Sequence, residues 1–175
     1  TDVDGNYAVA IGYAALENQE SDGANQELWN VAVGALAGAA VSSGIQNTYI
    51  GGYAGGGAVN TADNNVGVGF KALQLNTTGT QNIAIGTYAL DANTTAANNV
   101  GIGHSSLTVN TTGANNVAVG SNALDSNTTG AANVAIGYLA MDANTTASNN
   151  VAVGKSALAA NTTGTRNVAV GYAAL

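Results

Sequence analysis

Three aspartates recur at one position of a repeated sequence phrase, and their type and spacing could serve to bind a metal ion. Asp91, Asp125 and Asp142 each lie five residues after a glycine of the repeat. Stacked repeats would hold Asp125 and Asp142 about 4.8 Å apart, where two carboxylates repel and a calcium ion would relieve the repulsion. Other residue types take this position in the remaining repeats. The sequence therefore predicts no metal site. Asp125 and Asp142 are the candidate ligands if calcium does bind.

Few residues of this sequence could support catalysis. His104 is the only histidine and there is no cysteine, so this chain alone cannot build a Ser-His-Asp triad or a histidine-rich metal centre. The acids are too sparse on the regular repeats to place a carboxylate pair for glycan cleavage. We expect no enzymatic activity and no cofactor, and we expect His104 to be a solvated surface residue.

A recurring Asn-Thr-Thr triplet matches the acceptor pattern for N-linked glycosylation. The same residues, often followed by glycine, are typical of turns. The turn interpretation is favoured because the repeat needs a turn there, and the sequence leaves the glycosylation of these sites open. The triplets begin at Asn76, Asn93, Asn110, Asn127, Asn144 and Asn161.

The composition of the chain limits the classes of partner that it could bind. Only 7% of the residues are charged and the net charge is −7, so a nucleic-acid partner is not expected, because three basic residues cannot follow a phosphate backbone. No apolar run approaches the length of a membrane span. A surface of Asn, Thr, Ser, Gly and Ala without cysteine fits an extracellular or virion protein better than a cytosolic enzyme.

The elements that must position these residues follow from a short phrase: an aliphatic residue, a small residue, Val or Ile, then Gly. Successive glycines of the phrase are 22, 17, 18 and then regularly 17 residues apart, which indicates stacked coils of one repeat. The phrases begin at Val9, Val31, Thr48 (a degenerate copy), Val66, Ile83, Val100, Val117, Val134, Val151 and Val168.

Within one coil, alternation puts Val117 and Val119 on one face of a short strand and Ala118 on the other. We expect the valines and isoleucines to fill the interior together with a leucine four residues after the glycine. The small residue would face outward and let a neighbouring chain approach. The predicted core residues are Val117, Val119, Leu124, Val134, Ile136, Met141, Val151, Val153 and Leu158.

An asparagine precedes nearly every strand, and its copies in adjacent coils would stack as a hydrogen-bonded amide ladder. The predicted ladder residues are Asn82, Asn99, Asn116, Asn133, Asn150 and Asn167.

The fold class predicted from these patterns is all-β, a parallel β-solenoid of about ten 17-residue coils. Glycine, asparagine and threonine in every period leave no run long enough for a stable helix. Residues 1–175 form a single domain, with irregular N-terminal coils over 1–63 and regular repeats over 64–175. Roughly three large aliphatic residues per coil make a thin core, which favours an oligomer.

An acidic insert at 17–28 lengthens the first period by five residues. An insert of this kind is either a cap for the end of the rod or a recognition loop on one face. The candidate recognition residues are Glu17, Glu20, Asp22, Glu27 and Trp29. The small residues from Ala35 to Val41 and the glycines from Gly51 to Gly57 break the pattern too, and the sequence does not decide whether they mark close backbone packing or a distorted transition.

The unit Asn-Val-Ala-Val-Gly-x-x-Ala-Leu, as at 116–124 and 167–175, resembles the head repeat of YadA-like trimeric autotransporter adhesins. Similar repeats occur in phage tail-fibre proteins. The resemblance covers nearly the whole chain and implies a left-handed parallel β-roll, three chains about a common axis, and a role in surface attachment. The adhesin repeat is shorter, and no neck, coiled-coil stalk or membrane anchor is found within this sequence.

The expected function is therefore a structural shaft or head segment of a homotrimeric attachment fibre, located at a cell surface or on a virion. A cell-surface glycan or protein receptor would bind another part of the fibre. The alternatives are an ice- or surface-binding solenoid, suggested by the ladder of second threonines from Thr78 to Thr163, and a subunit of a self-stacking extracellular filament.

Overall fold

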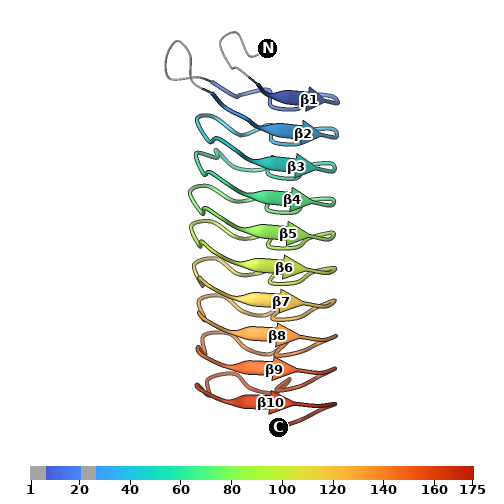
Figure 1. The fold of residues 1–175 in the computed structure, drawn as a ribbon, viewed down its shortest axis with the longest axis vertical. Helices are drawn as coiled ribbons and strands as arrows, with labels where there is room; N and C mark the ends of the chain where they lie inside the picture. Colours follow the sequence, from blue (N-terminus) through green and yellow to red (C-terminus); the bar gives the residue numbers. More distant parts are fainter. Residues whose placement is uncertain (1–6, 21–26) are drawn as a thin grey trace.

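The described part of the chain folds as a stack of ten short parallel strands, each contributed by one coil (Figure 1). The computed structural model describes residues 7–20 and 27–175. The strands form one sheet in the order of the sequence, from β1 to β10. This arrangement confirms the predicted all-β parallel solenoid with its 17-residue period.

Each strand is three residues long and pairs in register with the strands before and after it. Val117, for example, lies opposite Val134, and Ala118 lies opposite Ala135. The strands are β1 (Val9–Ile11), β2 (Val31–Val33), β3 (Thr48–Ile50), β4 (Val66–Val68), β5 (Ile83–Ile85), β6 (Val100–Ile102), β7 (Val117–Val119), β8 (Val134–Ile136), β9 (Val151–Val153) and β10 (Val168–Val170).

Hydrogen bonds between coils continue well beyond the strands. The Gly120 amide donates to the Ile102 carbonyl of the preceding coil at 2.7 Å, and the Leu124 amide donates to the Ala140 carbonyl of the following coil at 3.0 Å. The turn residue Thr128 donates to Thr145 O at 2.9 Å. The backbone is thus paired around most of each coil, which compensates for strands far shorter than the usual five or six residues.

The glycine that ends each strand is required by two constraints at once. Gly120 has a φ of 136°, a conformation that side chains rarely adopt. A Cβ atom at Gly120 would also lie 2.6 Å from the carbonyl oxygen of Gly137 in the next coil. Because the same glycine stacks on itself throughout the rod, every coil turns at the same place.

In most coils three further residues adopt the left-handed conformation without being glycine. In one coil these are Asn122 (φ 56°), Leu124 (φ 53°) and Ala132 (φ 56°). Each such residue costs about 1 kcal/mol or more, and the hydrogen bonds between coils offset this cost. These bends fold each coil into a flat loop, and none of the described residues forms a helix.

The strands face the opposite way from the sequence prediction. The middle residue points into the coil: Ala118, Ala135 and Ala152 are fully buried. The flanking Val and Ile side chains point outward and are partly or largely exposed, so their assignment to the core was wrong for Val117, Val119, Val134, Ile136, Val151 and Val153.

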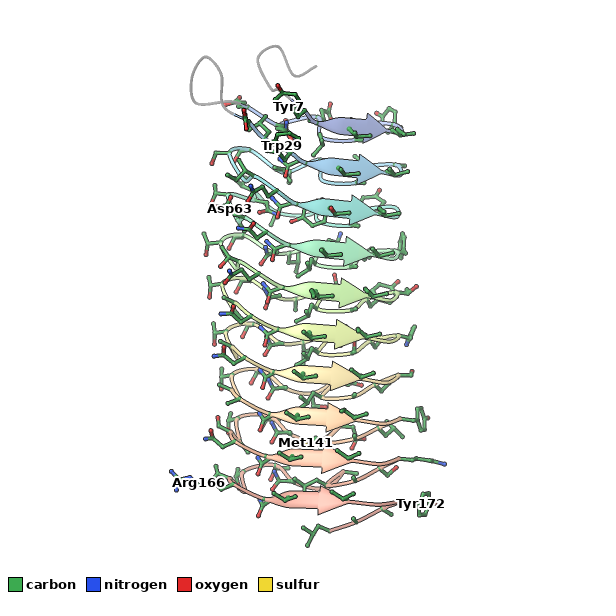
Figure 2. All side chains as sticks on the ribbon, viewed as in Figure 1. Tyr7, Trp29, Asp63, Met141, Arg166 and Tyr172 are labelled. Atoms are coloured by element: carbon green, nitrogen blue, oxygen red, sulfur yellow. The ribbon has the colours of Figure 1, made fainter. Side chains whose placement is uncertain are left out.

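The interior is too narrow for β-branched side chains at the strand. It holds the strand alanine, the alanine three residues after the glycine and the leucine that follows, such as Ala118, Ala123 and Leu124. The predicted core residues Leu124, Met141 and Leu158 do lie in this interior (Figure 2 labels Met141 within the stack). Alternation alone shows that two faces differ, but it does not show which face is inside.

Tyr49 explains the irregular glycine-rich coils. It takes the place of the strand alanine in β3 and is completely buried. Leucine is replaced by glycine in the preceding coil and in the coil of Tyr49 itself: a Cβ at Gly38 would lie 3.3 Å from Tyr49 Cδ2, and a Cβ at Gly55 would lie 2.5 Å from Tyr49 Cε1. One buried ring thus fills space that leucines fill elsewhere.

Burial raises the pKa of the Tyr49 phenol far above its ordinary value of 10.0. The nearby Asp63 carboxylate adds to the increase, whereas the hydrogen bond from Asn60 Nδ2 to Tyr49 Oη at 2.9 Å opposes it. The folded protein therefore holds this phenol in its neutral form.

Replacement of Gly120 by alanine should destabilise the protein by at least about 2 kcal/mol, because the new Cβ combines an unfavourable φ with a backbone clash. Urea unfolding followed by circular dichroism measures the change. Gly52→Ala is the matched control, since Ala35 holds the corresponding position in the preceding coil and a Cβ at Gly52 would come no closer than 3.4 Å to its nearest neighbour, Phe70 Cδ2. Equal losses in the two variants would contradict this account of the glycine column.

Alkaline pH should destabilise the protein through Tyr49. The neutral phenol is favoured in the folded state, so its contribution is complete below pH about 10, the pKa of an unfolded tyrosine, and is lost as the pH rises above it. Urea unfolding curves of the wild type and of Tyr49→Phe, recorded about every half pH unit between pH 8 and 11, measure this loss of stability. The Phe variant should lose less stability than the wild type over this range, and identical losses would exclude Tyr49 as the cause.

Candidate functional site

Two internal asparagine ladders run the length of the regular coils. In the first, the Oδ1 atom of the asparagine before one strand accepts the backbone N–H of its counterpart in the next coil. Asn116 N donates to Asn99 Oδ1 at 2.9 Å, and Asn133 N donates to Asn116 Oδ1 at 3.0 Å. The side-chain amide of Asn116 then donates to the Gly130 carbonyl at 2.8 Å. The predicted ladder residues Asn82, Asn99, Asn116, Asn133, Asn150 and Asn167 all take part.

Asn99 departs from this arrangement in one atom. Its Nδ2 group is buried without a hydrogen-bond partner, while its Oδ1 still accepts from Asn116. The ladder itself continues unbroken through this coil.

The second ladder consists of the asparagines of the Asn-Thr-Thr triplets, for which the sequence predicted only turns. Asn127 Nδ2 donates to Asn110 Oδ1 at 2.8 Å, and Asn144 Nδ2 donates to Asn127 Oδ1 at 2.8 Å. Each amide also closes its own turn, as Asn127 Nδ2 does by donating to the Gly130 carbonyl at 2.9 Å. Asn76 to Asn144 are fully buried, so the folded coils do not present these amides to a glycosylating enzyme.

The two threonines of each triplet have different environments. The first is half-buried, and its hydroxyl donates to the carbonyl of its counterpart in the next coil: Thr111 Oγ1 bonds to Thr128 O at 3.1 Å, and Thr128 Oγ1 to Thr145 O at 3.1 Å. The second threonine is exposed, as at Thr112 and Thr129. Only one column of threonine hydroxyls therefore remains available to solvent.

The outward-facing strand residues form a continuous apolar surface, which we call the outer face. It consists of the first and third residues of the ten strands, which are all Val or Ile apart from Thr48. Many are substantially exposed, among them Ile83 at 39%, Ile85 at 40% and Ile136 at 40%. The nine steps between strands, at about 4.8 Å each, make the face about 43 Å long.

The metal and histidine candidates lie on the surface. Asp125 and Asp142 are partly exposed in adjacent coils, and Asp125 Oδ2 accepts a hydrogen bond from Asn122 Nδ2 at 3.1 Å. Residues 7–20 and 27–175 contain no group of three or more His, Cys, Asp or Glu side chains that could hold a metal ion. His104 is exposed, as predicted.

Asp91, at the same position in an earlier coil, is more enclosed. Its Oδ1 atom is buried without a hydrogen-bond partner. Burial raises the pKa of this carboxyl group, and the positive charge of Lys71 partly opposes the shift.

Part of the acidic insert falls within the described residues. Glu17, Glu20 and Glu27 are exposed, whereas Asp22 lies outside the described residues. The Trp29 indole stacks on the Tyr7 ring, with 4.4 Å between centroids and 9° between planes, and its N–H donates to Glu27 Oε2 at 3.2 Å (Figure 2 labels both rings). The described part of the chain contains no helix long and apolar enough to cross a membrane.

Loss of one ladder asparagine should be costly. Asn127→Ala would leave Asn110 Oδ1 without its partner inside the coil stack. It would also remove one hydrogen bond each from Gly130 O and Asn144 Nδ2, which keep those to Asn116 Nδ2 and Ala147 O. For three lost bonds we expect a loss of about 3 kcal/mol. Chemical denaturation measures it. Thr129→Ala, two residues away at an exposed position, is the control and should change the stability by less than about 0.5 kcal/mol. A comparable change in both variants would contradict a structural role for the ladder.

Comparison with models of known protein families, with characterised proteins and with solved structures found no match to this chain.

Proposed function

We propose that this chain is a rod-like structural segment of a homotrimeric attachment fibre, acting in adhesion at a cell surface or on a virion. The observation that carries the proposal is the outer face. A soluble monomer rarely exposes a contiguous apolar patch of more than a few hundred Å². Here two columns of aliphatic side chains run along the whole stack of strands.

The dimensions of the outer face suit association with other copies of the chain. Its two columns are two residues apart, so its backbone footprint is about 7 Å by 43 Å, or about 300 Å² before the side chains are counted. No strand position on this face carries a charge. Burial of such a face removes Val and Ile side chains from water, at about 25 cal/mol per Å².

Three copies would bury a narrow face of this kind around a common axis parallel to the rod. Closed cyclic symmetry of this type gives each chain an equivalent environment. The resemblance to YadA-like heads and phage tail fibres supports three chains rather than two. The contact proposed here uses the Val and Ile columns, and not the strand alanines, because Ala118 and Ala135 are buried inside the coil.

The rod itself suits a spacer in an attachment fibre. The regular coils are nearly identical and their backbones are hydrogen-bonded to one another around most of each coil, which gives a stiff element of regular length. Repetition along a fibre would also multiply weak lateral contacts into avidity.

An ice- or crystal-surface binder is the second candidate, because the second threonines are exposed in a regular column. They are Thr78, Thr95, Thr112, Thr129, Thr146 and Thr163. However, the hydroxyls of the first threonine column are already bonded within the rod, so the polar ladder is one residue wide. A thermal-hysteresis assay tests this candidate directly.

Light scattering tests the trimer. The wild type should have three times the chain mass of 17.0 kDa. The double variant Val117→Glu/Val134→Glu puts two charges on the outer face and should shift the species to the mass of a monomer. The matched variant Thr112→Glu/Thr129→Glu adds the same charges to exposed positions in two adjacent coils and should remain trimeric.

A wild-type monomer would overturn the trimer, and a wild-type dimer would place two copies face to face. Dissociation of both double variants would mean that charge anywhere on the rod, and not burial of the outer face, controls assembly. Circular dichroism of each variant verifies that the coils remain folded.

A further inference from the structure

Most of the aromatic residues and two of the three basic residues of this chain gather along one edge of the rod. We call this the aromatic edge: the two residues that follow each strand-ending glycine. It holds five of the seven tyrosines, the only phenylalanine, the only histidine and both lysines. Because aromatic residues are only 5% of the chain, this concentration distinguishes the edge from the rest of the surface.

The rings in the middle coils form a continuous file. Tyr53 and Phe70 meet edge to face with 6.1 Å between centroids, Phe70 and Tyr88 with 5.8 Å, and Tyr88 and His104 with 6.2 Å. These perpendicular contacts hold each ring in place, so the edge presents a row of ordered rings to solvent.

Each lysine lies near two rings, although from different positions in the coil. Lys71 Nζ is 5.6 Å from the Phe70 centroid and 5.8 Å from the Tyr88 centroid. Lys155 Nζ is 5.8 Å from the Tyr138 centroid and 5.6 Å from the Tyr172 centroid. These distances lie within the range of cation–π contacts. The two lysines are five coils apart, about 24 Å along the rod.

The second of these sites is well exposed. Tyr138 is 50% and Tyr172 is 76% accessible, and Figure 2 shows Tyr172 at the edge of the rod opposite Arg166. Two of the three basic residues of a chain with net charge −7 are thus located beside exposed rings. No Asp or Glu occupies either position of the aromatic edge.

The side chains of the aromatic edge limit the chemical class of ligand that it could bind. A linear row of rings interrupted by ammonium groups and by the polar side chains of Ser121 and Asn122 matches a long polymer with apolar faces, hydroxyl groups and negative charges. The C–H faces of sugar rings stack on aromatic rings, and carboxylates pair with lysine. Tyr138 and Tyr172 are two coils apart, about 9.6 Å, which is close to the length of a disaccharide unit in an extended glycan.

We propose that the aromatic edge binds an extended acidic polysaccharide, with the rings stacking on its sugars and Lys71 and Lys155 pairing with its carboxylates. This is an activity of the rod itself, whereas the fibre function requires only that the rod be a spacer. It uses a different surface from the outer face and does not depend on the number of chains.

The test measures binding of hyaluronan oligosaccharides that span both lysines, by isothermal titration calorimetry at low salt. Lys71→Gln and Lys155→Gln should each weaken binding about tenfold, the loss of one charge-assisted contact. Tyr138→Ala/Tyr172→Ala should weaken it by at least as much. Arg166→Gln removes the same charge from the opposite edge and should leave the affinity unchanged.

Three results would overturn the proposal. If Arg166→Gln weakened binding as much as the lysine variants, general electrostatic attraction would explain the loss of affinity. Binding of a neutral β-glucan or of a single-stranded oligonucleotide as tightly as hyaluronan would exclude an acidic glycan as the specific ligand. A lower mass of Tyr138→Ala/Tyr172→Ala in light scattering would make the edge an interface between copies of the chain. Failure of the outer-face variant to dissociate would leave this proposal unaffected, since the two experiments probe separate surfaces.

Discussion

Each coil must hydrogen-bond to its neighbours at the spacing of adjacent β-strands, and the rest of the structure depends on this constraint. At that spacing a side chain meets its own counterpart above and below. Like charges would repel in such a stack, whereas an asparagine both donates and accepts and so bonds to a copy of itself. This explains why the two buried columns are asparagine and why charged residues are scarce.

The same close stacking sets the width of the interior. The strand and the returning segment leave room for alanine, a second alanine and one leucine in each coil. So small an apolar core contributes little by itself, and the bonded asparagines share in holding the coil together. Tyr49 shows how strict the volume is, because its ring is accommodated only where glycine replaces leucine at Gly38 and Gly55.

The narrow interior also determines which residues lie on the surface. Since the valines and isoleucines do not fit inside, they form an apolar outer face, and the bend at the stacked glycines projects the residues that follow along a separate edge. The rod thus has two distinct surfaces with different chemistry, one aliphatic and one aromatic and basic. Assembly through the first would leave a second surface whose composition favours a polar polymer.

The sequence by itself determined the period, the strand positions, the glycine turns and the first asparagine ladder, because stacking of identical coils translates a fixed repeat directly into columns. It also placed Leu124, Met141 and Leu158 in the core. Only the tertiary structure decided which strand face is inside, since Val117 and Ala118 alternate equally well in either orientation and the width of the closed coil selects the smaller residue. The second ladder through Asn127, the space cleared for Tyr49 and the pairing of each lysine with two rings likewise depend on how the chain closes each coil and stacks it on the next, which the local sequence pattern does not contain.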